Sequence, residues 1–474
     1  MVIPKPALFG LVEREFPVLV WVIEPLHIRV MEDLFADLFE LFRAYSSDGL
    51  SDSFSPLLRE LLKIEFVEWH FSYSLSPKRI AILLANPVAT NLSDFGPITK
   101  WKPAWTLGAE VYKLKLLFQE IRRNPLLWLL VFVPMVLVAE KLKPESHTLL
   151  FVLSVLAILP LATLLTHATE SVAAKTGDSI GGLLNSTLGN MTELVIAITA
   201  LQAGQYTLVK ASIAGAIVTN SLFMLGMSFL LGGLRYHVQE FNRIGARMQA
   251  GLLFLATVAL LIPSTIGSRL SPESAKFNRE LSVALAILLL AAYALGLLFS
   301  LKTHRELFAG VAEEEEAAWP MGLAVGTLAG VTVFVALVSE VFVGSVQEAA
   351  VSFGMTPAFV GFIIVALVGA AAEMTAAFSA ARKNHLDLSV TISLGSAAQI
   401  ALFVAPVLVL LSYFIGPAPM DLSFWTGAVA MVFFATLTAA LVTNSGRSMW
   451  FLGVLVLTVY LMFAAALYLL PPQT

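Results

Sequence analysis

Two carboxylates, Glu193 and Glu373, stand inside long apolar stretches of the sequence. Glu193 ends the segment GNMTE at 189–193 and is followed directly by LVIAITAL, whereas Glu373 ends the segment GAAAE at 369–373. An ionised carboxylate at the centre of a bilayer costs at least roughly 2.5 to 3.5 kcal/mol on insertion scales. Each of these side chains therefore requires a function or a partner if the segment that carries it crosses a membrane.

The residues around the two acids favour a site for a hard cation. Gly189 and Gly369 stand four positions before the acids and can interrupt a helix, and non-helical backbone at membrane depth is tolerated only where it lines a cavity or is buried in protein. Carboxylate, amide, hydroxyl and carbonyl oxygens make an all-oxygen set, and Ca²⁺ takes roughly six to eight such ligands. We therefore expect a site for Ca²⁺ or a similar divalent cation, with Glu193 and Glu373 as central ligands.

Other polar residues in the apolar region admit two interpretations. Asn190 and Asn220 are candidate ligands, but amide side chains also bridge transmembrane helices by hydrogen bonds. Glu170, Glu340 and Glu348 stand near the ends of predicted spans. A carboxylate that gates the pathway or reaches toward the interface explains these three acids at least as well as a direct ligand does.

The paired acids also supply an exchange mechanism. Two like charges close together in a dry cavity favour protonation when no cation is present, and a divalent cation displaces those protons. If the site opens to one side at a time, protons and cation occupy Glu193 and Glu373 alternately, which is antiport. The alternative is that both acids are structural, neutral groups that are hydrogen-bonded between helices.

The composition identifies an all-α polytopic membrane protein. Of 474 residues, 58% are hydrophobic and 13% are charged, and the mean hydropathy is +0.83, which leaves too little polar surface for a soluble domain. The absence of cysteine excludes disulfides and thiolate sites, and no basic cluster indicates nucleic acid. No Walker-type nucleotide-binding segment occurs. We therefore expect a transporter driven by an ion gradient, not an enzyme, without a resident cofactor and with cations, protons and the bilayer as partners; the oligomeric state stays open.

Eleven apolar segments approach the roughly 20 residues that cross a bilayer as a helix. The predicted spans are 126–141, 148–168, 179–203, 207–233, 248–267, 281–300, 320–343, 354–381, 387–415, 423–443 and 449–469. Lys and Arg number eleven in the loops on one side and six on the other, which favours a cytoplasmic N-terminus. A prokaryotic plasma (inner) membrane is the expected location.

The two hydrophobic halves repeat each other. Glu170 precedes Gly189 as Glu348 precedes Gly369, and each motif is followed by a second Gly-led segment, GAIVTN at 215–220 and GSAAQ at 395–399. Because each half holds an odd number of spans, the two copies cross the membrane in opposite directions. Four regions are expected. Residues 1–120 are an N-terminal extension that is partly an amphipathic helix, and residues 121–300 are the leading helix and the first repeat. Residues 301–319 are an acidic cytoplasmic linker, and residues 320–474 are the second repeat.

At this point the motifs resemble a known family. The stretches GGLLNSTLGNMTELVIAITAL and ARKNHLDLSVTISLGSAAQIALFVAPVLVLL, with ATES at 168–171 and VSEVFVGSVQEA at 338–349, are similar to the signature repeats of the calcium/proton exchangers in the cation/Ca²⁺ antiporter superfamily. The resemblance implies a leading helix, two inverted five-span repeats, and exchange of Ca²⁺ for H⁺. It places the central acids at Glu193 and Glu373, and further site residues at Asn190, Ser396 and Gln399.

The second repeat departs from the family pattern. Ala370 and Met374 stand where that pattern has Asn and His, and Ala216 and Ala397 stand where serines are usual. These changes bear on Ca²⁺ affinity, ion selectivity and the number of protons per cycle. Two alternatives therefore stay open, namely an antiporter coupled to Na⁺ or selective for another cation, and a transport-incompetent homologue that regulates or assembles with a partner.

Overall fold

The computed structural model describes residues 116–176, 178–266, 272–304 and 319–469. The chain divides into two units, Met1–Trp101 and Lys102–Thr474, and all described residues belong to the second. The predicted N-terminal extension, apart from its last residues, lies outside the described part, as does most of the acidic linker.

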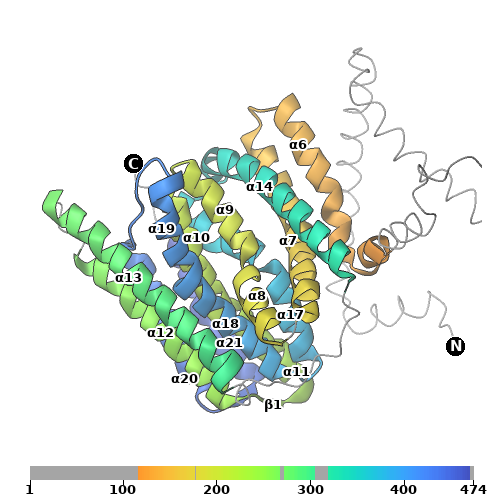
Figure 1. Ribbon diagram of the computed structural model, residues 1–474, viewed down its shortest axis with the longest axis vertical. Coiled ribbons are helices and arrows are strands. Elements are labelled where there is room, and N and C mark those ends of the chain that lie inside the picture. The colour runs from red at the N-terminus through yellow and green to blue at the C-terminus, as the bar shows by residue number, and fades with distance from the viewer. Residues whose placement is uncertain (1–115, 177, 267–271, 305–318, 470–474) are drawn as a thin grey trace, which may run out of the picture. The chain divides into compact units, whose positions relative to one another are not determined.

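The described residues form long helices, as the apolar runs predict (Figure 1). The first half contains a leading 3-10 segment η1 (Pro125–Val131), α6 (Phe132–Leu142), α7 (His147–Lys175), α8 (Asp178–Leu188), α9 (Met191–Gln202), α10 (Tyr206–Val218), η2 (Thr219–Met224), α11 (Leu225–Tyr236), β1 (Val238–Glu240), α12 (Arg243–Ile266), α13 (Pro272–Leu298) and η3 (Phe299–Thr303). The second half contains α14 (Met321–Ser352), α15 (Pro357–Phe359), η5 (Val360–Val365), α16 (Ala366–Gly369), α17 (Ala371–Arg382), α18 (Leu386–Gln399), η6 (Ile400–Val404), α19 (Ala405–Ile415), α20 (Thr426–Thr443), β2 (Arg447–Met449) and α21 (Trp450–Leu469).

The helices confirm the polytopic class, but not the count of eleven spans. Nine described helices are long and apolar enough to cross a membrane, and Pro357–Gly369 with Ala371–Arg382, bent by 59°, makes a tenth. The predicted span at 179–203 is divided into α8 and α9, and each of these is shorter than a full crossing. Eleven therefore remains a prediction that depends on counting α8 and α9 together.

The two halves match at a constant offset of 180 positions, as the pair Glu193 and Glu373 illustrates (373 − 193 = 180). Adding 180 to the bounds of α9 gives the bounds of α17. The turns that follow these helices also agree, because Gly204 and its equivalent Asn384 both have positive φ, 71° and 66°. Two chain segments with little sequence identity thus fold to the same pattern of breaks and turns.

Both halves contain a π-helical turn at the same place. The turn η2 connects α10 to α11, and η6 connects α18 to α19. Turns of this kind insert an extra residue into a helix and are frequent at functional sites. Asn220 lies within η2, and Gln399 immediately precedes η6.

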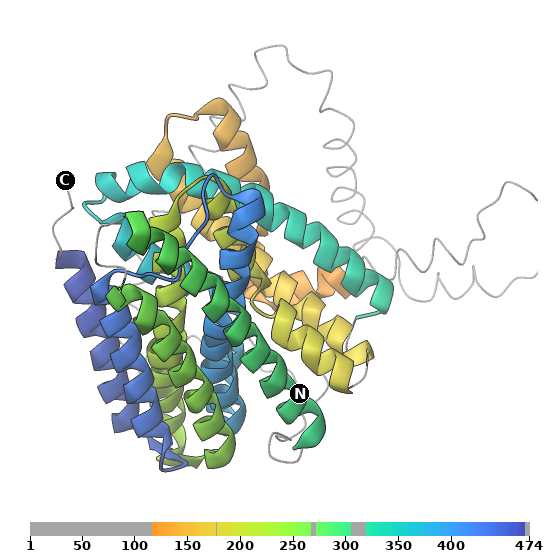
Figure 2. The same ribbon diagram turned by 60° about the vertical axis from the view of Figure 1, so that its left-hand side comes forward.

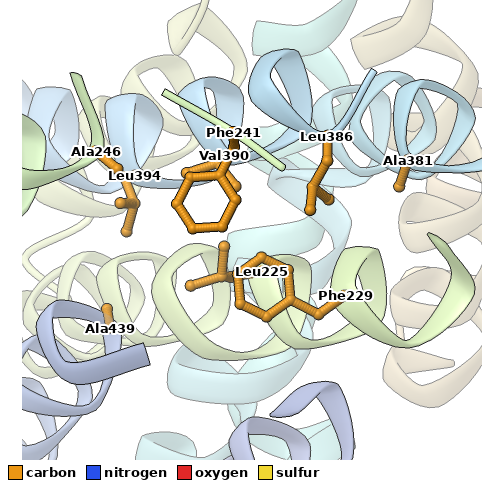
Figure 3. Packing of buried hydrophobic residues seen from close by; sticks show 9 residues of the cluster. All are labelled: Leu225, Phe229, Phe241, Ala246, Ala381, Leu386, Val390, Leu394 and Ala439. Atoms are coloured by element: carbon orange, nitrogen blue, oxygen red, sulfur yellow. The ribbon is translucent and has the colours of Figure 1, made fainter. Parts of the chain in front are cut away.

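The first and second halves pack against each other in the core. Long helix α14 runs alongside α7, while α12, α20 and α21 are neighbours in the rest of the bundle (Figures 1 and 2). Figure 3 shows Leu225 and Phe229 of α11 facing Leu386 and Val390 of α18 in one apolar cluster. This interdigitation holds segments from the two repeats together close to the site.

A short β-ribbon joins two of the predicted loops. β1 pairs with β2 in antiparallel register, with Gln239 opposite Ser448, and Arg447 lies 2.9 Å from Glu240. The pairing puts the chain after α11 and the chain after α20 on the same side, as the predicted topology requires.

Candidate functional site

The two central acids lie at corresponding helix starts. Glu193 is in the first turn of α9 and Glu373 is in the first turn of α17. Each helix follows a break in a longer apolar segment, at Gly189 and Asn190 in one half and at Ala370 in the other. Helix N-termini carry partial positive charge and unpaired N–H groups, which favour a nearby carboxylate.

Gly369 provides room for the Glu193 side chain. A Cβ at this position would lie 3.0 Å from Glu193 Cγ and 3.2 Å from Oε1. Gly369 is the last residue of α16, so the break itself falls one residue later, at Ala370. The predicted interruption before Glu373 is present, since the helices on its two sides are bent by 59°, and the small size of Gly369 also makes room for the acid from the other repeat.

Four candidate ligands form one chain of hydrogen bonds that crosses between the repeats. Asn190 Nδ2 donates to Gln399 Oε1 at 2.6 Å, and Ser396 Oγ donates to Asn190 Oδ1 at 3.0 Å. Asn220 Nδ2 donates to Ser396 Oγ at 2.8 Å. Asn190, Asn220 and Ser396 are almost fully buried, so these bonds fix the orientation of polar groups that water does not reach.

Glu373 lies within electrostatic range of this chain and of two other acids. The hydroxyl of Ser396 interacts with its carboxyl, and the charges of Glu193 and Glu170 both act on it. Charges from α9 and α7 thus act on the buried carboxyl of Glu373 on α17. Like charges repel strongly there, so the arrangement favours a bound cation or bound protons.

Several oxygens at the site lack a protein partner. Within the described residues, Glu193 Oε1, Glu373 Oε2 and Asn220 Oδ1 are buried and accept no hydrogen bond. A buried polar atom without a partner is uncommon and calls for a ligand or an ordered water. The described part of the chain brings together no group of three or more His, Asp and Glu suited to a metal, so a cation here requires amide and hydroxyl oxygens besides the two carboxylates.

A small cavity lies beside Glu193. Its volume is about 10 Å³, which is on the order of one water molecule. Among its lining residues are Ala216, Ile213, Val365 and Ile400, and most of its wall is apolar. The carboxyl of Glu193 thus faces less polar surroundings on this side than Glu373 has beside Ser396.

The three secondary acids differ in position. Glu170 is on the exposed side of α7 but within electrostatic range of Glu373. Glu348 lies at the other end of the α7 and α14 pair, where His147 Nε2 is 2.5 Å from its Oε2. Glu340 is exposed on α14. The structure therefore brings Glu170 toward the central acids and leaves Glu348 with a different partner.

The departures in the second repeat produce an apolar environment. Ala370 and Met374 pack with Met224 and Ala377 in a buried cluster. Phe223 and other apolar side chains border this cluster. The position equivalent to Asn190 therefore contributes no side-chain oxygen to the site.

The two halves also differ in how closely their helices cross. A Cβ on Gly215 of α10 would lie 2.1 Å from the carbonyl oxygen of Phe362 in η5, whereas a Cβ on its equivalent Gly395 would meet Gln249 Nε2 at 3.3 Å as its nearest neighbour. At Gly215 the two helices are thus in contact through their backbones. At Gly395 the nearest neighbour is a flexible side chain. No sequence pattern distinguishes these two glycines.

The comparisons with known proteins cover both repeats. The model of the family described as sodium/calcium exchanger protein matches residues 146–302 and 323–469. The Ca(2+)/H(+) antiporter of Synechocystis sp. is 39% identical over 361 residues, which cover 72% of this chain and 96% of that relative. The Ca(2+)/H(+) antiporter ChaA of Bacillus subtilis is 40% identical over 327 residues, which cover 68% of this chain and 92% of ChaA.

A solved structure agrees with these relatives. The structure of native YfkE, a Ca²⁺/H⁺ antiporter protein, superposes with a TM-score of 0.64 at 36% sequence identity. The match covers 73% of this chain and 100% of that one. The resemblance noted in the sequence motifs is thereby confirmed over both repeats.

Proposed function

Because this chain belongs to the sodium/calcium exchanger protein family, and within it to the calcium/proton exchangers, we propose that it exchanges Ca²⁺ for H⁺ across a membrane by alternating access. It is a multi-pass membrane transporter driven by an ion gradient. The exchange as proposed requires no resident cofactor. Its substrates are inorganic cations and protons.

One observation carries this function. Glu193 and Glu373 come from two repeats related by a constant offset, and each lies in the first turn of a half-helix. Amide and hydroxyl groups from the same two repeats, Asn190, Ser396 and Gln399, are hydrogen-bonded to one another. Charged residues inside a membrane segment mark an ion pathway when they face the interior of the bundle. Half-helix ends at broken segments are the places where secondary transporters hold their ions.

The cation is held by oxygens from both repeats. Glu193 and Glu373 supply the negative charge, and Asn190, Ser396 and Gln399 supply neutral oxygens. Asn220 orients the Ser396 hydroxyl, and its own buried Oδ1 accepts no bond from the described residues. This mixed oxygen set suits Ca²⁺, which accepts irregular geometry and a high ligand number.

Protons replace the cation at the same carboxylates. When the cation leaves, Glu193 and Glu373 repel each other in a poorly solvated space, and protonation removes that repulsion. The cation and the protons therefore exclude each other from the site. This exclusion is what couples their movement in opposite directions.

The unequal glycine crossings indicate one state of the transport cycle. Gly215 of α10 meets the backbone of Phe362 in η5, whereas the equivalent Gly395 has only a side chain as its neighbour. In the proposed cycle the first crossing is the closed end of the site and the second is the end that opens. Glu170, toward the C-terminal end of α7, acts electrostatically on Glu373, and we assign it to the end that opens. With the N-terminus in the cytoplasm of a prokaryotic cell, this end faces inward, and Glu340 and Glu348 belong to the outer part of the pathway.

Vesicles test this function directly. Purified protein is reconstituted into proteoliposomes with an imposed pH gradient, and a dye reports the gradient after each cation is added. Ca²⁺ should dissipate the gradient in protein-containing vesicles and leave it unchanged in empty ones. Ca²⁺ flux that depends on Na⁺ instead indicates sodium coupling, and a folded protein that responds to neither ion indicates a regulatory homologue.

A further inference from the structure

The constant offset shows which polar contact the second half of the site has lost. Asn190 and Ser396 bond to each other across the repeats at 3.0 Å. Their equivalents, 180 positions away, are Ala370 and Ala216 (190 + 180 = 370; 396 − 180 = 216). Both partners of this amide–hydroxyl pair are therefore alanine in the equivalent place.

The retained pair supports one of the two acids. Ser396 interacts with Glu373, and Asn190 extends the contact to Gln399 through a 2.6 Å hydrogen bond. We refer to Asn190, Ser396 and Gln399 as the polar shelf. Its serine lies beside Glu373, and all three side chains offer neutral oxygens to a cation held there.

The equivalent place beside Glu193 lacks this amide–hydroxyl pair, and the hydroxyl of Ser212, which lines the cavity there, donates to the carbonyl of Val209. Ala216 and Glu193 line the same small cavity, just as Ser396 lies beside Glu373. Ala370 is 0% exposed and directly follows Gly369, against which the Glu193 side chain packs. Glu193 Oε1, like Glu373 Oε2, has no partner among the described residues, but Glu193 has no counterpart of Ser396 beside it.

The residue equivalent to Gln399 also contributes nothing to a second shelf. Thr219 corresponds to Gln399 (399 − 180 = 219), and its hydroxyl lies 3.3 Å from that of Tyr460 on α21. Thr219 is fully buried in η2. This part of the second shelf thus serves helix packing instead of the site.

The energetics of hydrogen bonds explain why alanine at one of these positions favours alanine at the other. Removing one partner leaves the other buried and unsatisfied at a cost of about 1–3 kcal/mol, whereas replacing both with apolar groups is nearly neutral. Asn at 370 opposite Ala216 would leave its amide in the apolar cluster around Met374. The joint absence of both groups leaves no such defect.

We propose that Ala216 and Ala370 act as a coupled pair that removes a second polar shelf, and that this pair sets the cation affinity of the exchanger. The inference rests on the proposed function and refines it. The site binds its cation from one side, with neutral oxygens beside Glu373, and Glu193 contributes charge alone. Water completes the coordination on the side of Glu193, and the affinity for Ca²⁺ is lower than that of a site with two shelves.

The test restores the lost shelf in purified protein and measures thermal unfolding with increasing Ca²⁺, because a ligand that binds the folded state raises its apparent stability. Ala370→Asn alone should lower Tm, since its amide has no partner. Ala216→Ser combined with Ala370→Asn should recover most of that loss. The double variant should also bind Ca²⁺ about tenfold more tightly than the wild type, a change of about 1.4 kcal/mol.

The retained shelf provides the matched control. Asn190→Ala and Ser396→Ala should each lower Tm and weaken Ca²⁺ binding, and the double variant should lower Tm by less than the sum of the single changes. Such coupling is the expected signature of residues in contact. The size of this coupling in Tm is the size expected for a restored contact between positions 216 and 370.

The outcomes separate the inference from the function it rests on. If the wild type shows no Ca²⁺-dependent change in Tm, the proposed function fails regardless of the variants. If the wild type responds but the folded double variant binds Ca²⁺ no more tightly, the inference alone is overturned. Should the double variant fail to fold, Ala216→Ser by itself, which adds one hydroxyl beside Glu193, must still tighten Ca²⁺ binding, and unchanged binding overturns the proposal.

Discussion

The side chain of Glu193 in the first repeat packs against Gly369 in the second, so that a Cβ at this glycine would lie 3.0 Å from Glu193 Cγ. Gly369→Ala should therefore move the carboxyl by a few tenths of an ångström and lower Ca²⁺ flux severalfold. Protein stability should change little, because the obstructing atoms belong to a side chain that can move. Flux in proteoliposomes and Tm are measured together on each variant.

Gly344→Ala is the matched control for this change. Gly344 lies on α14 with no heavy atom within 4 Å of a built Cβ, and alanine is favoured over glycine within a helix. Its flux should equal that of the wild type. Equal flux in Gly369→Ala and Gly344→Ala would show that Glu193 does not need the space at Gly369.

Neutralising either central acid should abolish exchange. Glu193→Gln and Glu373→Gln keep side-chain size and hydrogen-bonding capacity but remove the charge that holds a divalent cation. Both variants should fold with nearly wild-type Tm in the absence of Ca²⁺. Glu240→Gln, which alters an exposed surface pair with Arg447, should transport normally, and wild-type flux in both site variants would refute the assigned roles.

Ca²⁺ binding should weaken as the pH falls. Protonated carboxyl groups cannot hold the cation, so lowering the pH shifts the competition toward protons and diminishes the stabilisation that Ca²⁺ provides. With two carboxylates involved, the logarithm of the apparent Ca²⁺ association constant should rise by more than one and up to about two per pH unit in the range where both titrate. Calcium titrations of Tm at several pH values measure this slope.

The same titrations on Glu373→Gln distinguish one exchangeable proton from two. Whatever residual cation binding this variant retains should follow pH with a slope of one or less, because a single central carboxylate remains. A slope that matches the wild type would place the second proton on another group. Glu170, which acts electrostatically on Glu373, would then be the next candidate.

The two glycine crossings predict different tolerance to the same small substitution. Gly215→Ala puts a methyl group within 2.1 Å of a backbone oxygen that cannot rotate away, so either the crossing opens or the fold loses about 1–3 kcal/mol, as for overpacked cores. Gly395→Ala, at the equivalent position, meets only the end of Gln249 at 3.3 Å and should leave Tm nearly unchanged. Similar Tm values for the two variants would contradict the closed crossing seen at Gly215.

An ion pair between α10 and the segment before α20 contributes to stability. Lys210 Nζ lies 2.6 Å from Asp421 Oδ1, with the two side chains 18% and 29% exposed, and also donates to the Ser423 carbonyl at 2.8 Å. Lys210→Met should lower the free energy of unfolding by about 1–2 kcal/mol, because a half-buried carboxylate loses its partner.

A surface lysine supplies the comparison for that variant. Lys276 lies 3.8 Å from Glu280 with both side chains largely exposed, and exposed pairs contribute about 0–1 kcal/mol. Lys276→Met should therefore shift Tm little. Denaturant or thermal unfolding measures the loss of stability in both variants. Equal losses would mean that partial burial does not strengthen the pair of Lys210 and Asp421.

Much of this protein follows from its sequence alone. Long apolar runs must become helices in a membrane because backbone polar groups find no water there, and acids at bilayer depth require a purpose. The spacing of Glu193 and Glu373 within two repeats therefore predicts both the class of fold and the central pair of the site. Family membership follows from the motifs around those acids, and the sequence comparison confirms it.

Tertiary structure decided the features that depend on contacts across the two repeats. The partners of Asn190 lie more than 200 positions away, and helical periodicity carries no information on which distant side chains meet. The same limit applies to Gly215 and Gly395, which have equivalent positions in sequence but different neighbours in space. The sequence marks Ala216 and Ala370 as separate departures from the family pattern, and only the hydrogen bond between their equivalents, Ser396 and Asn190, shows that the two belong to one missing contact.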